Sequence, residues 1–155
     1  VFLKRLSIKF CIMHYVNYFV LFKNAIEERN VTIKELEDKN ILKTNTFYNF
    51  STYCPSINNA IKIANFLKMS LDYILEKTDN NIFRPYKQHQ TNFYNNLKNL
   101  LNSYNISNQK FLKDLHMNKD NVTNWKNGAV PKLSTIIKIA EYLDCNIDDL
   151  MDVEK

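Results

Sequence analysis

The chain has 155 residues, a formal net charge of +5 and a hydrophobic content of 45%, which is normal for a globular protein. It contains only one Gly and three Pro, too few for the many tight turns of an all-β fold. Composition therefore argues against a disordered chain and favours an all-α protein.

The chain begins with an apolar run, VFLKRLSIKFCIMHYVNYFVLF, that has some features of a signal or membrane segment. Lys9 and His14 interrupt it, so that it falls short of the roughly 18 clean apolar residues of a membrane span. It also lacks a small-residue cleavage site. We expect no membrane association and interpret residues 1–16 as an N-terminal extension, with residues 1–12 as a candidate stretch upstream of a start at Met13.

Two parts of the chain repeat each other. Residues 60–67, AIKIANFL, are similar to residues 136–143, IIKIAEYL, at an offset of 76, whereas Val31 and Thr32 match Ile106 and Ser107 at an offset of 75. We therefore expect one inserted residue in the second copy, near 126–130. A duplication of this length predicts two domains rather than a solenoid.

Apolar residues recur at helical spacing through both copies. The first copy is predicted to form helices at about 17–29, 32–40, 44–50, 57–68 and 70–77, and the second at about 92–104, 107–115, 118–126, 133–143 and 146–152. The intervening segment TDNNIFRPYKQHQT is polar and predicts a linker that reaches at most about 45–50 Å. The predicted organisation is all-α, with domains at 17–77 and 92–152 joined by a linker at 78–91.

Charge is unevenly distributed in the second copy. From Lys98 to Lys138 there are 7 Lys against two Asp, whereas from Glu141 to Glu154 there are six acids and no base. Each copy is close to neutral overall, so net charge alone is a weak argument for nucleic acid. A basic half beside an acidic end nevertheless supplies the local field that a phosphate-binding surface needs.

The most specific motif is ISNQKFLKDLHMNKDNVTNWKNG at residues 106–128. Ser107 and Asn118 stand at helix-capping positions, and the apolar residues around Trp125 are expected to pin two helices together. Gly128, the only Gly in the chain, follows the third helix, where a left-handed residue commonly ends a helix. A helical fold alone accounts for the apolar and capping positions of this motif.

This motif resembles the Cro/repressor-type (XRE family) helix-turn-helix, with Trp125 and Gly128 at the close of the family's pattern. The resemblance covers most of 92–152 and, more weakly, 18–77. It implies two tandem five-helix, lambda-repressor-like domains. The family's turn Gly is replaced by His116 in the second copy and by Ile41 in the first.

In the family's docking mode the start of the third helix reads base edges. Asn124 can pair in bidentate fashion with adenine and Lys119 can donate to guanine, each contact giving about 1–3 kcal/mol of discrimination. Taken singly, each candidate could equally be a solvated surface residue. The predicted DNA-binding residues are Ser107, Asn108, Lys119, Asp120, Asn121, Thr123, Asn124, Lys126, Asn127 and Lys132. The weaker candidates in the first copy are Thr32, Lys43, Thr44, Asn45, Tyr48 and Asn49.

The function predicted from the sequence is sequence-specific binding of double-stranded DNA by a transcriptional regulator, a repressor of a phage or other mobile element. Two linked domains could occupy half-sites one turn apart, about 34–36 Å, with or without a homodimer or protein partner. The alternative is a protein-interaction module, such as an antitoxin-like partner with weak or no DNA binding.

Several other kinds of function lack support in the sequence. Cys11, Cys54 and Cys145 are widely spaced and no Cys/His ligand spacing occurs, which predicts free thiols in a cytoplasmic protein. We find no phosphate-cradling Gly-rich loop, no HExxH motif and no nucleophile elbow. No enzyme activity, metal site or cofactor is therefore predicted.

Overall fold

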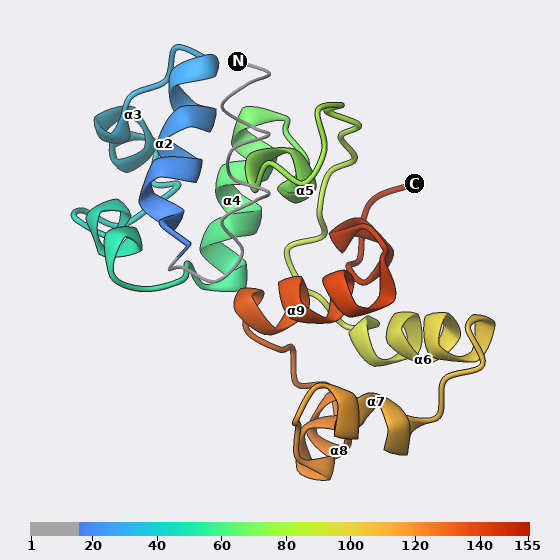
Figure 1. The fold of residues 1–155 in the computed structure, drawn as a ribbon. Helices are drawn as coiled ribbons and strands as arrows, with labels where there is room; N and C mark the ends of the chain where they lie inside the picture. The colour runs from blue at the N-terminus through green and yellow to red at the C-terminus, as the bar shows by residue number, and fades with distance from the viewer. Residues whose placement is uncertain (1–15) are drawn as a thin grey trace.

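The computed structural model describes residues 16–155, and these residues form eight α-helices and two 3₁₀ helices with no β-strand (Figure 1). The all-α class predicted from the sequence is therefore confirmed, while most of the N-terminal extension and Cys11 lie outside the described residues. The helices are α2 (Tyr18–Glu28), α3 (Ile33–Asp38), η1 (Phe47–Ser51), α4 (Ile57–Leu67), α5 (Leu71–Ile74), α6 (Phe93–Ser103), α7 (Asn108–Asp114), α8 (Lys119–Lys126), α9 (Leu133–Leu143) and η2 (Ile147–Asp149).

The elements follow one order twice along the chain. In the first half, residues 16–77, the order is α2, α3, η1, α4 and α5; in the second half, residues 92–155, it is α6, α7, α8, α9 and η2. Each half thus has a long first helix, a short second helix, a third helical element, a long fourth helix and a short last one. Among the described residues, no helix is long and apolar enough to cross a membrane.

Side-chain caps begin several of the short helices, and the cap predicted at Ser107 is among them. Thr32 Oγ1 accepts from Glu35 N–H at 3.1 Å, and Ser107 Oγ accepts from Lys110 N–H at the same distance. Ser70 Oγ accepts from Tyr73 N–H at 3.1 Å. Such bonds satisfy donors that the first turn of a helix leaves without an intrahelical partner.

Two of the predicted helices form as short 3₁₀ helices. The helix expected at 44–50 is η1, which begins only at Phe47, because Asn45 adopts a left-handed φ of 64° that a helix cannot include. The helix expected at 146–152 is the three-residue η2. Its continuation stops where Asp152 N–H donates to Gln90 Oε1 at 2.6 Å instead of to a carbonyl one turn back.

The connecting segment, residues 78–91, packs between the two halves. Tyr86 is only 2% exposed, and its backbone N–H and carbonyl both pair with the Asn65 side chain, at 2.8 and 2.9 Å. Its hydroxyl accepts from Leu71 N–H at 2.8 Å and donates to the Asp148 carboxylate. The segment therefore fastens α4 and α5 of the first half to the last turn of the second.

The acidic end of the chain is part of this packing. Asp152 Oδ2 accepts from the N–H groups of Thr91 and Asn92, at 2.7 and 3.0 Å, where α6 begins. Burial alone would raise the pKa of Asp152, but these hydrogen bonds outweigh it and hold the pKa below its usual value. Glu141 receives an ion pair from Lys77 of the first half at 2.8 Å. Asp152 and Glu141 therefore bind the connecting segment and the first half, respectively.

Candidate nucleic-acid interface

The motif at residues 106–128 forms two helices, α7 and α8, joined by a tight turn. His116 takes a φ of +53° in that turn, and Met117 N–H returns to Leu112 carbonyl oxygen at 2.9 Å. Asn118 Oδ1 then accepts from Asp120 N–H at 3.1 Å and begins α8, as the sequence predicts. A left-handed residue is therefore needed at position 116, and His116 supplies it where the resemblance implied Gly.

Aromatic residues hold α8 against the body of the second half. Trp125 is buried and meets Phe93 of α6 edge to face, with ring centroids 5.4 Å apart. Phe111 of α7 is fully buried and meets Tyr142 of α9 in the same manner at 5.9 Å. These contacts hold α8 against α6 and α7 against α9, and so limit the freedom of both helices. Neither contact joins α7 to α8 directly, so the pinning of this helix pair by Trp125 stays a prediction.

Polar contacts fix α7 against α9. Tyr142 hydroxyl donates to the Asp114 carboxylate at 2.8 Å, and Lys110 pairs with the same carboxylate at 2.7 Å. The hydrogen bonds from Lys110 and Tyr142 hold the pKa of Asp114 below its usual value. Lys138 Nζ donates to Leu115 carbonyl oxygen at 2.9 Å, where its charge complements the C-terminal end of α7.

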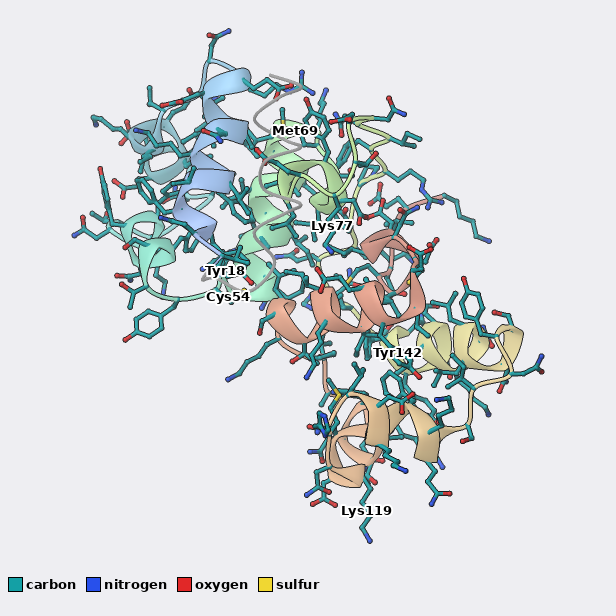
Figure 2. All side chains as sticks on the ribbon, in the orientation of Figure 1. Tyr18, Cys54, Met69, Lys77, Lys119 and Tyr142 are labelled. Carbon is teal, nitrogen blue, oxygen red and sulfur yellow. The ribbon has the colours of Figure 1, made fainter. Side chains whose placement is uncertain are left out.

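The opposite face of α8 is polar and exposed. Lys119, Asp120, Thr123 and Asn124 are all exposed, whereas Asn121 is half-buried. Figure 2 shows Lys119 pointing away from the rest of the molecule, at the end formed by α7 and α8. The exposed residues recur at the four-residue spacing of one helix face, so that they form a single surface. We call this surface the α8 face, and it comprises Lys119, Asp120, Thr123, Asn124 and the adjoining Lys126 and Asn127.

The remaining candidates of the second half lie on either side of the α8 face along the chain. Ser107 and Asn108 are exposed at the start of α7, and Ser107 Oγ already accepts a helical N–H. Lys132 is exposed just before α9. Gly128, after α8, has a φ of +97°, so the predicted left-handed end of this helix is confirmed.

Some lysines of the second half already bind another group of the protein, so fewer are available to a ligand than the sequence contains. Lys110 is paired with Asp114, and Lys138 is bound to a backbone carbonyl, so both serve the fold. Lys119, Lys126 and Lys132 form no ion pair within residues 16–155. Lys98, Lys113 and Lys155 form no ion pair within this range either. Three of these six lysines therefore lie on or beside the α8 face.

The first half presents a different surface at the corresponding place. Its exposed candidates are Thr32, Lys43, Thr44, Asn45, Tyr48 and Asn49. Asn45 N–H donates to Glu37 Oε1 at 2.8 Å, which places an acid among them. Tyr48 stacks on Phe19 of α2 with centroids 6.2 Å apart. This surface is aromatic and amide-rich, with less positive charge than the α8 face.

The turn of the first half is shifted by one residue from our expectation. Ile41 was expected to occupy the position of the turn Gly, but the left-handed residue is Asn40, with a φ of 56°. This prediction is wrong because α3 is one residue shorter than α7, so that the offset of 76 already applies here. Asn tolerates a left-handed φ, whereas a β-branched Ile is strongly disfavoured there.

Some residues that position the site were missed in the sequence. Lys110 and Asp114 are four residues apart on one helix, so their ion pair could have been predicted. The contact of Tyr142 with Asp114 joins residues 28 apart and carries no local signal. Cys54 and Cys145 were expected to be free thiols, and both are free.

A short helix, a left-handed turn and a second helix that exposes a polar face define a helix-turn-helix protein. Residues 96–155 match the family model for the Cro/C1-type HTH DNA-binding domain. This part of the second half is therefore similar to one Cro/C1-type helix-turn-helix, a kind of domain that the family model describes as DNA-binding. No curated protein and no solved structure matches the chain.

Proposed function

We propose that the chain binds a specific sequence of double-stranded DNA through the α8 face and regulates transcription as a repressor. The observation that carries this proposal is the exposed row of Lys119, Thr123 and Asn124 on a helix whose other side is fixed by Trp125. A rigid helix of this kind can enter the major groove, where Lys and Asn donors distinguish bases.

The proposed roles divide between bases and backbone. Asn124 and Lys119 would contact base edges, with Asp120, Asn121 and Thr123 completing the reading surface. Positions at the two ends would contact phosphates, because backbone contacts set the orientation of a DNA-binding helix. The proposed phosphate contacts are Ser107, Asn108, Lys126, Asn127 and Lys132.

We further propose that residues 17–77 are a second, degenerate copy of the domain in 92–152, with 78–91 between them. The repeated order of elements and the paired caps at Thr32 and Ser107 support the duplication. A repressor of this size acting on the DNA of a phage or other mobile element would work in the cytoplasm.

Selection from a randomised duplex pool tests the proposal. We expect enrichment of one motif, and the Lys119→Ala and Asn124→Ala double variant should bind it at least about tenfold more weakly with an unchanged melting temperature. The matched control is Lys62→Ala, which removes one exposed Lys from α4, away from the α8 face. Unchanged affinity in the double variant, or absence of any enriched motif, would contradict DNA reading by α8.

A specific observation favours a second candidate, a protein-interaction module. The first half exposes Tyr53 at 70%, Tyr48 at 54% and Val20 at 47%, and side chains of this kind are available to a protein partner. An antitoxin-like partner would use such a surface for a protein. If no duplex is selected but Tyr48→Ala and Tyr53→Ala abolish capture of one defined partner, this second function replaces the first.

A further inference from the structure

The last helices of the two halves meet through equivalent residues. Asp72 in α5 and Asp148 in η2 both lie two residues after their N-caps, Ser70 and Asn146, at the offset of 76 that relates the two halves here. Each aspartate faces the other half. We call Leu71, Asp72, Tyr86, Ile147 and Asp148 the seam cluster.

The bonds within the seam cluster are reciprocal. The Asp72 carboxylate accepts from Ile147 N–H, the first residue of η2, at 2.9 and 3.1 Å. The Asp148 carboxylate accepts from Tyr86 hydroxyl, which in turn accepts from Leu71 N–H, the first residue of α5. Each half therefore supplies a carboxylate to the first N–H of the other half's last helix, once directly and once through a tyrosine hydroxyl.

From this reciprocity we infer that the chain is a built-in dimer, with its two halves related by an approximate two-fold axis through the seam cluster, and that it reads one DNA duplex with two unequal half-sites at a fixed separation. The inference rests on the proposed function. It adds that the separation is set by buried contacts and not by the reach of a linker.

The seam cluster can hold the two halves at a fixed distance from each other. Asp72 is only 5% exposed, and the hydrogen-bonded groups of a buried polar network are costly to pull apart. A second contact reinforces it, because the Cys54 thiol, with Tyr18 beside it, lies against the backbone of Ser134 at the start of α9. In Figure 1, α3 and the α7–α8 pair lie at opposite ends of the molecule, with α4 and α9 between them.

The two half-sites should differ in sequence. The α8 face offers Lys119 and Asn124, whereas the first half offers Tyr48 and Asn49 with the Glu37 carboxylate nearby. These donors and apolar surfaces select different base edges. A symmetric palindrome is therefore not expected, although the two surfaces are arranged as in a dimer.

A spacing series on the selected duplex tests the inference with the unmodified chain. Insertion of about 5 base pairs between the half-sites turns one half-site to the opposite side of the duplex, since a turn is about 10–10.5 base pairs. We expect affinity to fall by about a hundredfold, the order of gain that a linked second site provides. Insertion of a full turn between the half-sites should lower the affinity almost as much. If the two halves were joined only by a flexible 14-residue linker, the affinity would stay nearly unchanged after this insertion. Equal affinity across the series would overturn the inference.

Footprints separate failure of this inference from failure of the proposed function. Hydroxyl-radical cleavage should reveal two protected stretches with one chain bound per duplex. Lys43→Ala with Tyr48→Ala should remove one stretch and Lys119→Ala with Asn124→Ala the other, while the Lys62→Ala control keeps both. A single stretch that only the α8 variants remove, or two chains per duplex, overturns the built-in dimer and leaves DNA reading intact. Absence of any protection refutes both proposals.

Discussion

The carboxylate of Asp72 accepts a hydrogen bond from the backbone N–H of Ile147, 75 residues further along the chain. This bond lies in a buried seam, where burial raises the pKa of Asp72 above its ordinary value. Burial also raises the pKa of Asp148 on the other side of the seam. The contact between the halves therefore depends on two acids whose charge is unfavourable in their surroundings.

Stability should depend on pH through these two acids. Because their pKa values are raised in the folded state, the native protein binds protons more readily than the unfolded chain, and the free energy of unfolding falls as pH rises from the ordinary value of 3.8 through the raised values. In Asp72→Asn with Asp148→Asn this component should disappear. Urea unfolding from about pH 4 to 7, with exposed Asp120→Asn as control, measures the difference. If the free energies of unfolding of variant and parent differ by the same amount at every pH in this range, the pH dependence does not come from Asp72 and Asp148.

Removal of one oxygen atom from Tyr86 should weaken the joint between the halves. Tyr86→Phe leaves Leu71 N–H and the Asp148 carboxylate without their shared partner, and a buried polar group left unpaired costs about 1–3 kcal/mol. Equilibrium denaturation measures this loss. Tyr53→Phe is the matched control, since that ring is largely exposed and its hydroxyl should contribute little.

Backbone conformation alone should make Gly128 difficult to replace. A Cβ at this position would meet no atom within 4 Å, but φ is +97°, a region that L-residues rarely adopt. Gly128→Ala is expected to lower the free energy of unfolding by about 1–2 kcal/mol. Gly128→Asn should cost less, because Asn tolerates left-handed conformations better. Thermal denaturation of the pair distinguishes conformational strain from a steric clash, which would penalise the larger Asn more.

Lysines of the second half should separate into two groups by their effects. Lys138→Met removes the bond to Leu115 carbonyl oxygen and a charge at the end of α7, and should lower stability by about 0.3–1 kcal/mol. Lys119→Met should leave stability unchanged and reduce DNA affinity and its salt dependence. Melting temperatures and affinity at two salt concentrations, measured on both variants, test this division. Equal effects of the two substitutions on both measurements would refute it.

Local signals explain how much could be predicted from the sequence. The caps at Thr32, Ser107 and Asn118 and the left-handed Gly128 depend on a few adjacent residues, and each has the geometry that its residue type favours. The all-α class follows from helical periodicity in the same way. The base-reading roles of the α8 face stay predictions, since exposure alone does not identify what a side chain binds.

Contacts between distant residues explain what could not be predicted. Tyr86 lies in a polar stretch with Pro85 nearby, and its buried place depends on distant partners, which are Asn65 and Leu71 in the first half and Asp148 in the second. The sequence places Asp148 in the first turn of the last predicted helix, where the helix dipole favours an acid, but it does not indicate which distant groups the C-terminal acids bind. Asp148 and Asp152 lie where N–H or hydroxyl donors of other elements need an acceptor.

The burial of Trp125 against Phe93 gives this protein an intrinsic optical probe. Trp125 is the only tryptophan in the chain, so ultraviolet emission excited at the red edge of the protein spectrum comes from α8 alone. Seven of the nine tyrosines lie in the two halves, four in residues 16–77 and three in residues 92–155. If the seam couples the halves, tryptophan emission and far-ultraviolet circular dichroism will follow a single unfolding transition. Two separate transitions would reveal that the halves melt independently.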